Sequence, residues 1–180
     1  MIGVVIAVLF VVLVLFFGVT TFNGLVKKRN ALADAWAGID VQLTRRADLV
    51  PNLVEVVKGY KLHEQQTLED VVATRNGAKG ATAAGQAEEK VGNAVGSLIA
   101  VAEAYPDLKA NTNFQSLQNE LATLEEDLSF ARRYYNGTVR NYNTAQQTFP
   151  TVLFARALGF SPAEYFQADL DAKDAPSAHM

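Results

Sequence analysis

The chain has 180 residues, contains no cysteine and carries a formal net charge of −3 at pH 7. The lack of cysteine excludes disulfide bonds, thiolate catalysis and cysteine-ligated metal sites. With 16 basic against 19 acidic side chains, the composition gives no basic surface of the kind that binds phosphate backbones, so no nucleic-acid partner is expected.

The first 26 residues form an uncharged and largely apolar segment. At about 1.5 Å of rise per residue, a helix of this length spans a hydrocarbon core roughly 30 Å thick, and its apolar residues contribute about −4 to −8 kcal/mol to insertion. A cleaved signal peptide is disfavoured, because nothing basic precedes the run and the run is too long. The side chains expected to contact lipid are Ile2, Val4, Val5, Ile6, Val8, Leu9, Phe10, Val11, Val12, Leu13, Val14, Leu15, Phe16 and Phe17.

Three basic residues, Lys27, Lys28 and Arg29, follow this segment directly. By the positive-inside rule they predict a single-pass protein of the plasma membrane, with its N-terminus outside and the remaining chain in the cytoplasm. The same residues would also suit a helix cap or lipid headgroups on either side of the membrane. The opposite topology therefore stays open.

A long first helix is predicted after the anchor, from apolar residues that recur every three or four positions. Its stripe consists of Leu32, Trp36, Ile39, Leu43, Val50, Leu53, Val57 and Tyr60, and the helix is expected to end near Asn76. Because the stripe keeps its phase across Pro51, we expect a bend there rather than a break. No proline or loop signal separates this helix from residues 1–26, so the two are expected to be continuous.

A second helix is predicted over residues 86–105, after a loop rich in glycine and alanine at residues 77–85. Its buried side carries Val91, Val95, Leu98 and Ile99, and Pro106 is expected to stop it.

A third helix is predicted to begin at Thr112, which would form a capping box with Gln115. Its stripe consists of Phe114, Leu117, Leu121, Leu124, Leu128, Ala131, Tyr135, Tyr142, Ala145 and Phe149. Pro150 should end it, with a short helix at residues 152–158 and a last helix capped at Ser161.

These elements predict an all-α fold, since no strand pattern occurs. The expected architecture is a transmembrane helix, residues 1–26, continuous with the first helix of an antiparallel bundle of three to four helices. The bundle domain would cover residues 27–172, with short C-terminal helices, and residues 173–180 would be a disordered tail.

Two motifs stand out in this predicted bundle: Arg-Arg-x-Asp-Leu-x-Pro-Asn-Leu, which begins at Arg45, and Tyr-Asn-x-x-Val-x-x-Tyr-Asn, which begins at Tyr135. In both motifs the chain resembles the LemA family of bacterial membrane proteins. The resemblance implies an N-terminal membrane helix, a bundle of long antiparallel helices and a role in the cell envelope. It implies no catalytic residues and no cofactor.

Candidate chemistry in the sequence is weak. His63 and Glu64 begin like a zinc-protease motif, but Thr67 stands where the second histidine is needed, so no metal site is expected. Most aromatic residues are expected in the core, with Tyr134 exposed.

Charged residues near Pro51 and on the third helix are expected to form a structural polar network. Arg46 lies on the apolar stripe and must be paired if it is buried, which would fix the helix register. The members of the network are expected to be Arg46, Asp48, Asn52, Glu125 and Asp127. A hydrolase that uses Arg46, Glu125 and Asp127 is the weaker alternative, since no nucleophile is evident.

Helix lengths predict self-association. After the anchor the first helix is roughly 80 Å long and the second about 30 Å, so the membrane-proximal part of the first would lack an intrachain partner. Its apolar residues Leu32, Trp36, Ile39 and Leu43 are therefore expected to contact neighbouring copies. The sequence thus favours a self-associating scaffold whose partners are the lipid bilayer and its own copies, with an extracytoplasmic adaptor as the alternative.

Overall fold

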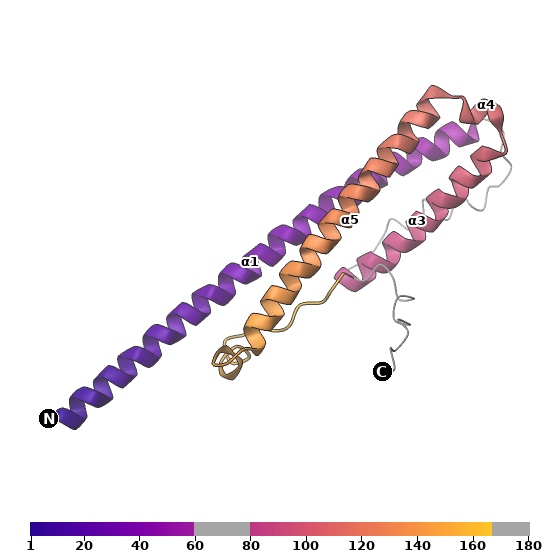
Figure 1. Ribbon diagram of the computed structural model, residues 1–180. Helices are drawn as coiled ribbons and strands as arrows, with labels where there is room; N and C mark the ends of the chain where they lie inside the picture. The colour runs from indigo at the N-terminus through magenta and orange to yellow at the C-terminus, as the bar shows by residue number, and fades with distance from the viewer. Residues whose placement is uncertain (60–79, 167–180) are drawn as a thin grey trace, which may run out of the picture. The chain divides into compact units, whose positions relative to one another are not determined.

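The computed structural model describes residues 1–59 and 80–166, and in these ranges the chain is helical without strands (Figure 1). The helices are α1 (Ile2–Lys58), α3 (Ala81–Glu103), α4 (Pro106–Lys109) and α5 (Thr112–Gln147), followed by the 3₁₀ helix η1 (Thr151–Leu153). The all-α prediction is confirmed. The predicted helix end at Asn76, the motif at His63 and the tail at residues 173–180 lie outside the described residues.

Helix α1 joins the apolar segment to the bundle without interruption, as predicted, and it continues through Pro51. Among the described residues it is the one helix whose length and composition suffice to cross a membrane. Within α1, the side-chain hydroxyl of Thr20 donates to the carbonyl oxygens of Phe16 and Phe17, at 3.1 and 2.9 Å. This polar side chain is therefore satisfied within its own helix, as an apolar environment requires.

Helix α3 begins at Ala81, five residues earlier than predicted. Gly80 precedes it with a φ of 96°, a conformation that glycine adopts without strain, and its carbonyl accepts from the amide of Ala84 at 3.0 Å. The alanines of this stretch favour the helix, so the predicted loop at residues 77–85 is wrong over residues 81–85. Pro106, which was expected only to stop the helix, opens the one-turn helix α4.

Helix α5 is capped by Asn111 rather than by Thr112. The side-chain oxygen of Asn111 accepts from the backbone amides of Asn113 and Phe114, at 2.9 and 3.1 Å. The Gln115 side chain instead donates to the carbonyl of Lys109 at 2.8 Å. The predicted capping box is therefore displaced by one residue, and asparagine supplies the cap.

The segment after α5 departs from the predicted helices. Turns follow η1, and Gly159, with a φ of 80°, reverses the chain so that the amide of Phe160 donates to the carbonyl of Ala155 at 3.0 Å. Residues 160–166 are not helical, and polar side chains of α5 bond the backbone of Ala163 and the carbonyl of Ser161 in this stretch. The amide group of Asn143 bonds both the N–H and the carbonyl of Ala163, at 2.8 and 2.9 Å.

The described chain forms two compact units, to both of which α1 and α5 contribute. The first unit combines Met1–Ala37 with Tyr134–Ala163, and the second combines Gly38–Arg133 with the chain from Glu164. The core of the first contains Leu25, Tyr142, Ala155 and Phe160. The core of the second contains Val50, Leu53, Val54, Val57, Val95, Leu98, Ala102, Leu108, Phe114 and Leu121.

The apolar stripes predicted from periodicity supply most of these core residues. One exception is Phe149, which was expected on the buried stripe of the third helix and is 81% exposed. It lies beyond the last residue of α5, where helical periodicity no longer sets its direction. Tyr134 is exposed, as predicted.

A buried charge network as the candidate functional site

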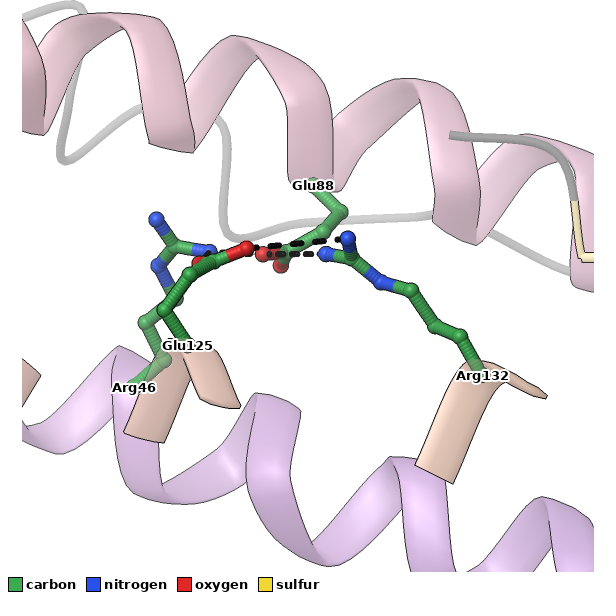
Figure 2. A network of polar contacts seen from close by, with 4 residues as sticks. All are labelled: Arg46, Glu88, Glu125 and Arg132. Atoms are coloured by element: carbon green, nitrogen blue, oxygen red, sulfur yellow. Dashed lines mark hydrogen bonds and ion pairs between the residues drawn. The ribbon is translucent and has the colours of Figure 1, made fainter. Parts of the chain in front are cut away.

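Four charged side chains meet between α1, α3 and α5 in the second unit (Figure 2). The guanidinium of Arg46 on α1 donates to the carboxylate of Glu88 on α3 and, at 3.0 Å, to that of Glu125 on α5. Arg132 on α5 donates to the same oxygen of Glu88 at 3.0 Å and lies 3.6 Å from Glu125. Two cations thus alternate with two anions across three helices, and the network is neutral.

The network is set by the position of each residue on its helix. Arg46 lies on the buried stripe of α1, seven residues after Ile39 and four before Val50, and Glu88 lies on the α3 stripe seven residues before Val95. On α5, Glu125 and Arg132 are two turns apart, next to the buried stripe that holds Leu124 and Leu128. The same helical period that buries the apolar side chains therefore carries the charges inward.

Burial dominates the electrostatics of the network. The side chains of Arg46 and Glu88 are 8% and 4% exposed, whereas that of Glu125 is about half exposed. Burial lowers the pKa of Arg132; the nearby Glu125 carboxylate raises it, and Arg46 adds to the lowering. Arg132 also lies over the ring of Phe166, with 5.4 Å from the guanidinium carbon to the ring centre.

A groove of about 530 Å³ runs past the network and is lined by all four of its residues. Its remaining lining comes from Glu89 and from glycine, alanine, branched aliphatic and amide side chains of α3 and α5. None of the described residues that line it is serine, threonine, cysteine, tyrosine or histidine. The arrangement therefore offers carboxylates that already accept from guanidinium groups, and it suits the cross-linking of helices better than nucleophilic chemistry.

The structure brings together two of the five residues predicted for this network, Arg46 and Glu125. Asp48 and Asn52 are exposed on α1, and Asp127 lies 3.9 Å from Arg45 in a half-exposed pair. Glu88 was missed, although it continues the stripe of Val91, Val95 and Leu98 towards the N-terminus of α3. A search of that stripe for charged residues, like the one that found Arg46, would have identified it.

The residues predicted to contact other copies pack against other residues of the same chain. Ile39 is fully buried, Leu32 packs against the core of the first unit, and Leu43 is half-buried. Trp36 packs edgewise on Tyr135, with 5.4 Å between ring centres. The expectation that this stripe lacks an intrachain partner is therefore wrong: α5 has 36 residues and returns along the membrane-proximal part of α1 in the first unit.

The membrane segment has no such cover. Every side chain predicted to contact lipid, from Ile2 to Phe17, is exposed. Lys27, Lys28 and Arg29 are exposed as well, and the guanidinium of Arg29 lies over the ring of Phe160 at 5.4 Å.

Comparison with known proteins shows where the chain belongs. It is 25% identical to the LemA protein of Metamycoplasma hominis over 150 residues, which cover 81% of this chain and 68% of that protein. It is also 34% identical over 76 residues to the magnetosome proteins MamQ 1 and MamQ 2 of Paramagnetospirillum magneticum, and the match covers 42% of this chain. The chain spans only 28% of the length of each MamQ protein. The sequence model of the LemA family matches residues 35–179, and the chain belongs to this family.

Proposed function

We propose that this protein is a membrane-anchored, non-enzymatic scaffold of the bacterial plasma membrane, with its N-terminus outside and its bundle in the cytoplasm. The observation that carries the proposal is the continuity of α1, which runs from the exposed apolar segment into the buried stripe of the bundle. A helix shared in this way couples the bundle to the bilayer without a flexible linker. The bundle is then held at a fixed height above the membrane.

Two further observations support a structural rather than a catalytic role. The buried charges form ion pairs between helices, and these pairs fix the register of one helix against the next. The names of the related proteins, LemA and magnetosome protein MamQ, denote no reaction.

Cysteine accessibility tests the anchoring and the topology together. The native chain has no cysteine, so a short Gly-Ser-Cys extension placed before the apolar segment and Asn119→Cys on the exposed side of α5 each introduce a single thiol. In intact spheroplasts an impermeant maleimide should label the N-terminal cysteine, whereas Asn119→Cys should react only after permeabilisation. The reverse pattern would favour an extracytoplasmic adaptor, and recovery of the protein in the soluble fraction would contradict the anchor.

We also propose that the protein self-associates, but through a different surface from the one expected from the sequence. Because the stripe of Leu32, Trp36 and Ile39 is covered by the chain itself, we assign contacts between copies to the membrane segment, whose apolar side chains are exposed. Light scattering of the protein in mild detergent should give a mass of more than one chain. Replacement of residues 2–17 by a polyleucine segment, which keeps the span but changes its packing, should lower that mass; a monomeric native protein would contradict this assignment.

A further inference from the structure

The turn that follows α5, residues 148–159, exposes a cluster of large apolar side chains. Phe149 is 81% and Leu153 64% exposed, and Val152, Phe154 and Leu158 are exposed beside them. Single apolar residues on a surface need no explanation, but five exposed within one turn of twelve residues indicate an interaction site.

The same turn is fixed to the membrane-proximal end of the apolar segment. Phe160 packs edgewise on Phe22, with 5.6 Å between ring centres, and Ala155 shares a core cluster with Leu25. Phe22 lies about 30 Å along the helix from Ile2 at 1.5 Å per residue, which equals the thickness of a hydrocarbon core. The contact therefore lies where α1 would leave the bilayer.

The turn is held in this position by several independent contacts. The amides of Gly159 and Phe160 donate back to Arg156 and Ala155, at 3.1 and 3.0 Å, which closes the turn in the manner of a helix C-cap. The side chain of Asn143 then fixes the chain at Ala163. The exposed side chains are thus carried by a preorganised element rather than by a loose loop.

Charge in this unit complements an anionic surface. Met1–Ala37 and Tyr134–Ala163 contain one acidic side chain, Asp34, although the whole chain has a net charge of −3. Their basic side chains are Lys27, Lys28, Arg29, Arg140 and Arg156. Arg156 stands within the turn itself and is exposed.

We propose that residues 148–159 form a second membrane contact, which inserts Phe149 and Leu153 into the interface of the bilayer that α1 crosses. Apolar side chains flanked by basic ones are the composition of interfacial membrane-binding elements, and Arg156 would contact anionic headgroups. A lipid surface fits better than the same turn of a second copy, because two turns packed against each other would bring their exposed Arg156 side chains together. The proposal rests on the membrane anchoring of α1 proposed above.

Depth-dependent fluorescence quenching of the full chain in vesicles tests the proposal. Leu153→Cys, Leu9→Cys and Asn141→Cys are each labelled with an environment-sensitive fluorophore and reconstituted in phosphatidylcholine with phosphatidylglycerol. Asn141 is the matched control, since it is exposed on α5 in the same unit. The label at Leu153 should be blue-shifted and quenched by nitroxides on the lipid acyl chains several times more strongly than the label at Asn141.

The outcomes separate this proposal from that of the anchor. Quenching at Leu9 without quenching at Leu153 would overturn the second contact and leave the anchor intact, whereas absence of quenching at both positions would overturn both. A blue shift at Leu153 without lipid quenching would show that protein covers the turn, and would also overturn the proposal.

Lipid charge provides a second readout. Arg156→Gln should reduce quenching at Leu153 in vesicles that contain phosphatidylglycerol and leave it unchanged in pure phosphatidylcholine. Equal quenching with and without Arg156 in both lipids would contradict the headgroup contact. Because Arg156 and Leu153 are exposed, both variants should keep the native helical content, which circular dichroism checks.

Discussion

Glu88 is the residue on which the buried network depends, because it accepts from Arg46 and Arg132 at once. Its carboxylate supplies one of the two negative charges that balance two guanidinium groups. Removing one partner of a buried ion pair costs far more than the pair itself contributes, since the remaining charge stays buried without compensation.

Glu88→Gln should therefore lower the free energy of unfolding by about 3–5 kcal/mol. Thermal unfolding followed by circular dichroism in mild detergent measures the loss. Asp127→Asn is the matched control: its pair with Arg45 is half-exposed with 3.9 Å between the charged atoms, and such pairs contribute at most about 1 kcal/mol. A Glu88→Gln variant as stable as Asp127→Asn would show that the network does not hold the helices together.

Tyr142 gives the first unit a dependence on alkaline pH. Burial raises the pKa of its phenol, and the nearby Arg29 lowers it in part. The unfolded chain then loses this proton more readily than the folded chain, so the contribution to stability is complete below about pH 10 and is lost as pH rises through the folded pKa.

Tyr142→Phe should remove this contribution and flatten the loss of stability above about pH 10. Unfolding midpoints measured at neutral and alkaline pH for the native protein and the variant provide the check. Tyr134→Phe, at an exposed position, should follow the native curve. The interpretation fails if Tyr142→Phe shows the same alkaline loss as the native protein.

At the scale of elements, the start of α5 illustrates how a side chain decides a helix boundary. Asn111 accepts from two free amides of the first turn, while Thr112 is the first residue of the helix and is exposed. Both residue types are good N-caps, and the sequence alone favoured threonine because a glutamine follows three residues later.

Asn111→Ala should cost about 1 kcal/mol of stability, because it leaves those amides without an acceptor. Thr112→Ala should change stability by no more than a few tenths of a kcal/mol, since alanine is also a good helix former. Chemical denaturation of both variants measures the difference. A larger loss for Thr112→Ala would restore the capping box that the sequence predicted.

Much of the fold could be predicted from helical periodicity, because burial of one face follows directly from it. The stripe from Leu121 to Leu128 and the continuity of α1 are examples. The non-helical path of residues 160–166 could not be predicted, because Ser161 and Ala163 are held by Asn143 and Gln146, which lie 15–20 residues earlier in the sequence. Which side chains pair in the network could not be predicted either, because the pairing depends on how three helices pack, although Glu88 itself lies on the apolar stripe of α3 and a search of that stripe would have found it.

For the whole molecule, the structure differs most from the sequence-based expectation at the face of α1 that carries Trp36. Trp36 was expected at a contact between copies, and it packs instead on Tyr135 of the same chain. Its role is thus to close the first unit.

Trp36→Ser should lower stability by about 2 kcal/mol, since a half-buried aromatic side chain loses its packing. It should leave the mass of the detergent-solubilised protein unchanged, as measured by light scattering. Ala33→Ser, on the exposed side of the same helix, provides the control. A fall in mass without a loss of stability would return this face to the contact between copies.

The first unit is assembled from two stretches of chain, Met1–Ala37 and Tyr134–Ala163. During synthesis the first stretch leaves the ribosome roughly a hundred residues before the second, a delay on the order of 5–20 s at typical bacterial rates of elongation. Leu25, Leu32 and Trp36 stay exposed throughout this interval, because the residues that cover them have not yet been made. Maturation of this protein therefore includes a late step, in which the newly made end of α5 packs on α1 and buries them.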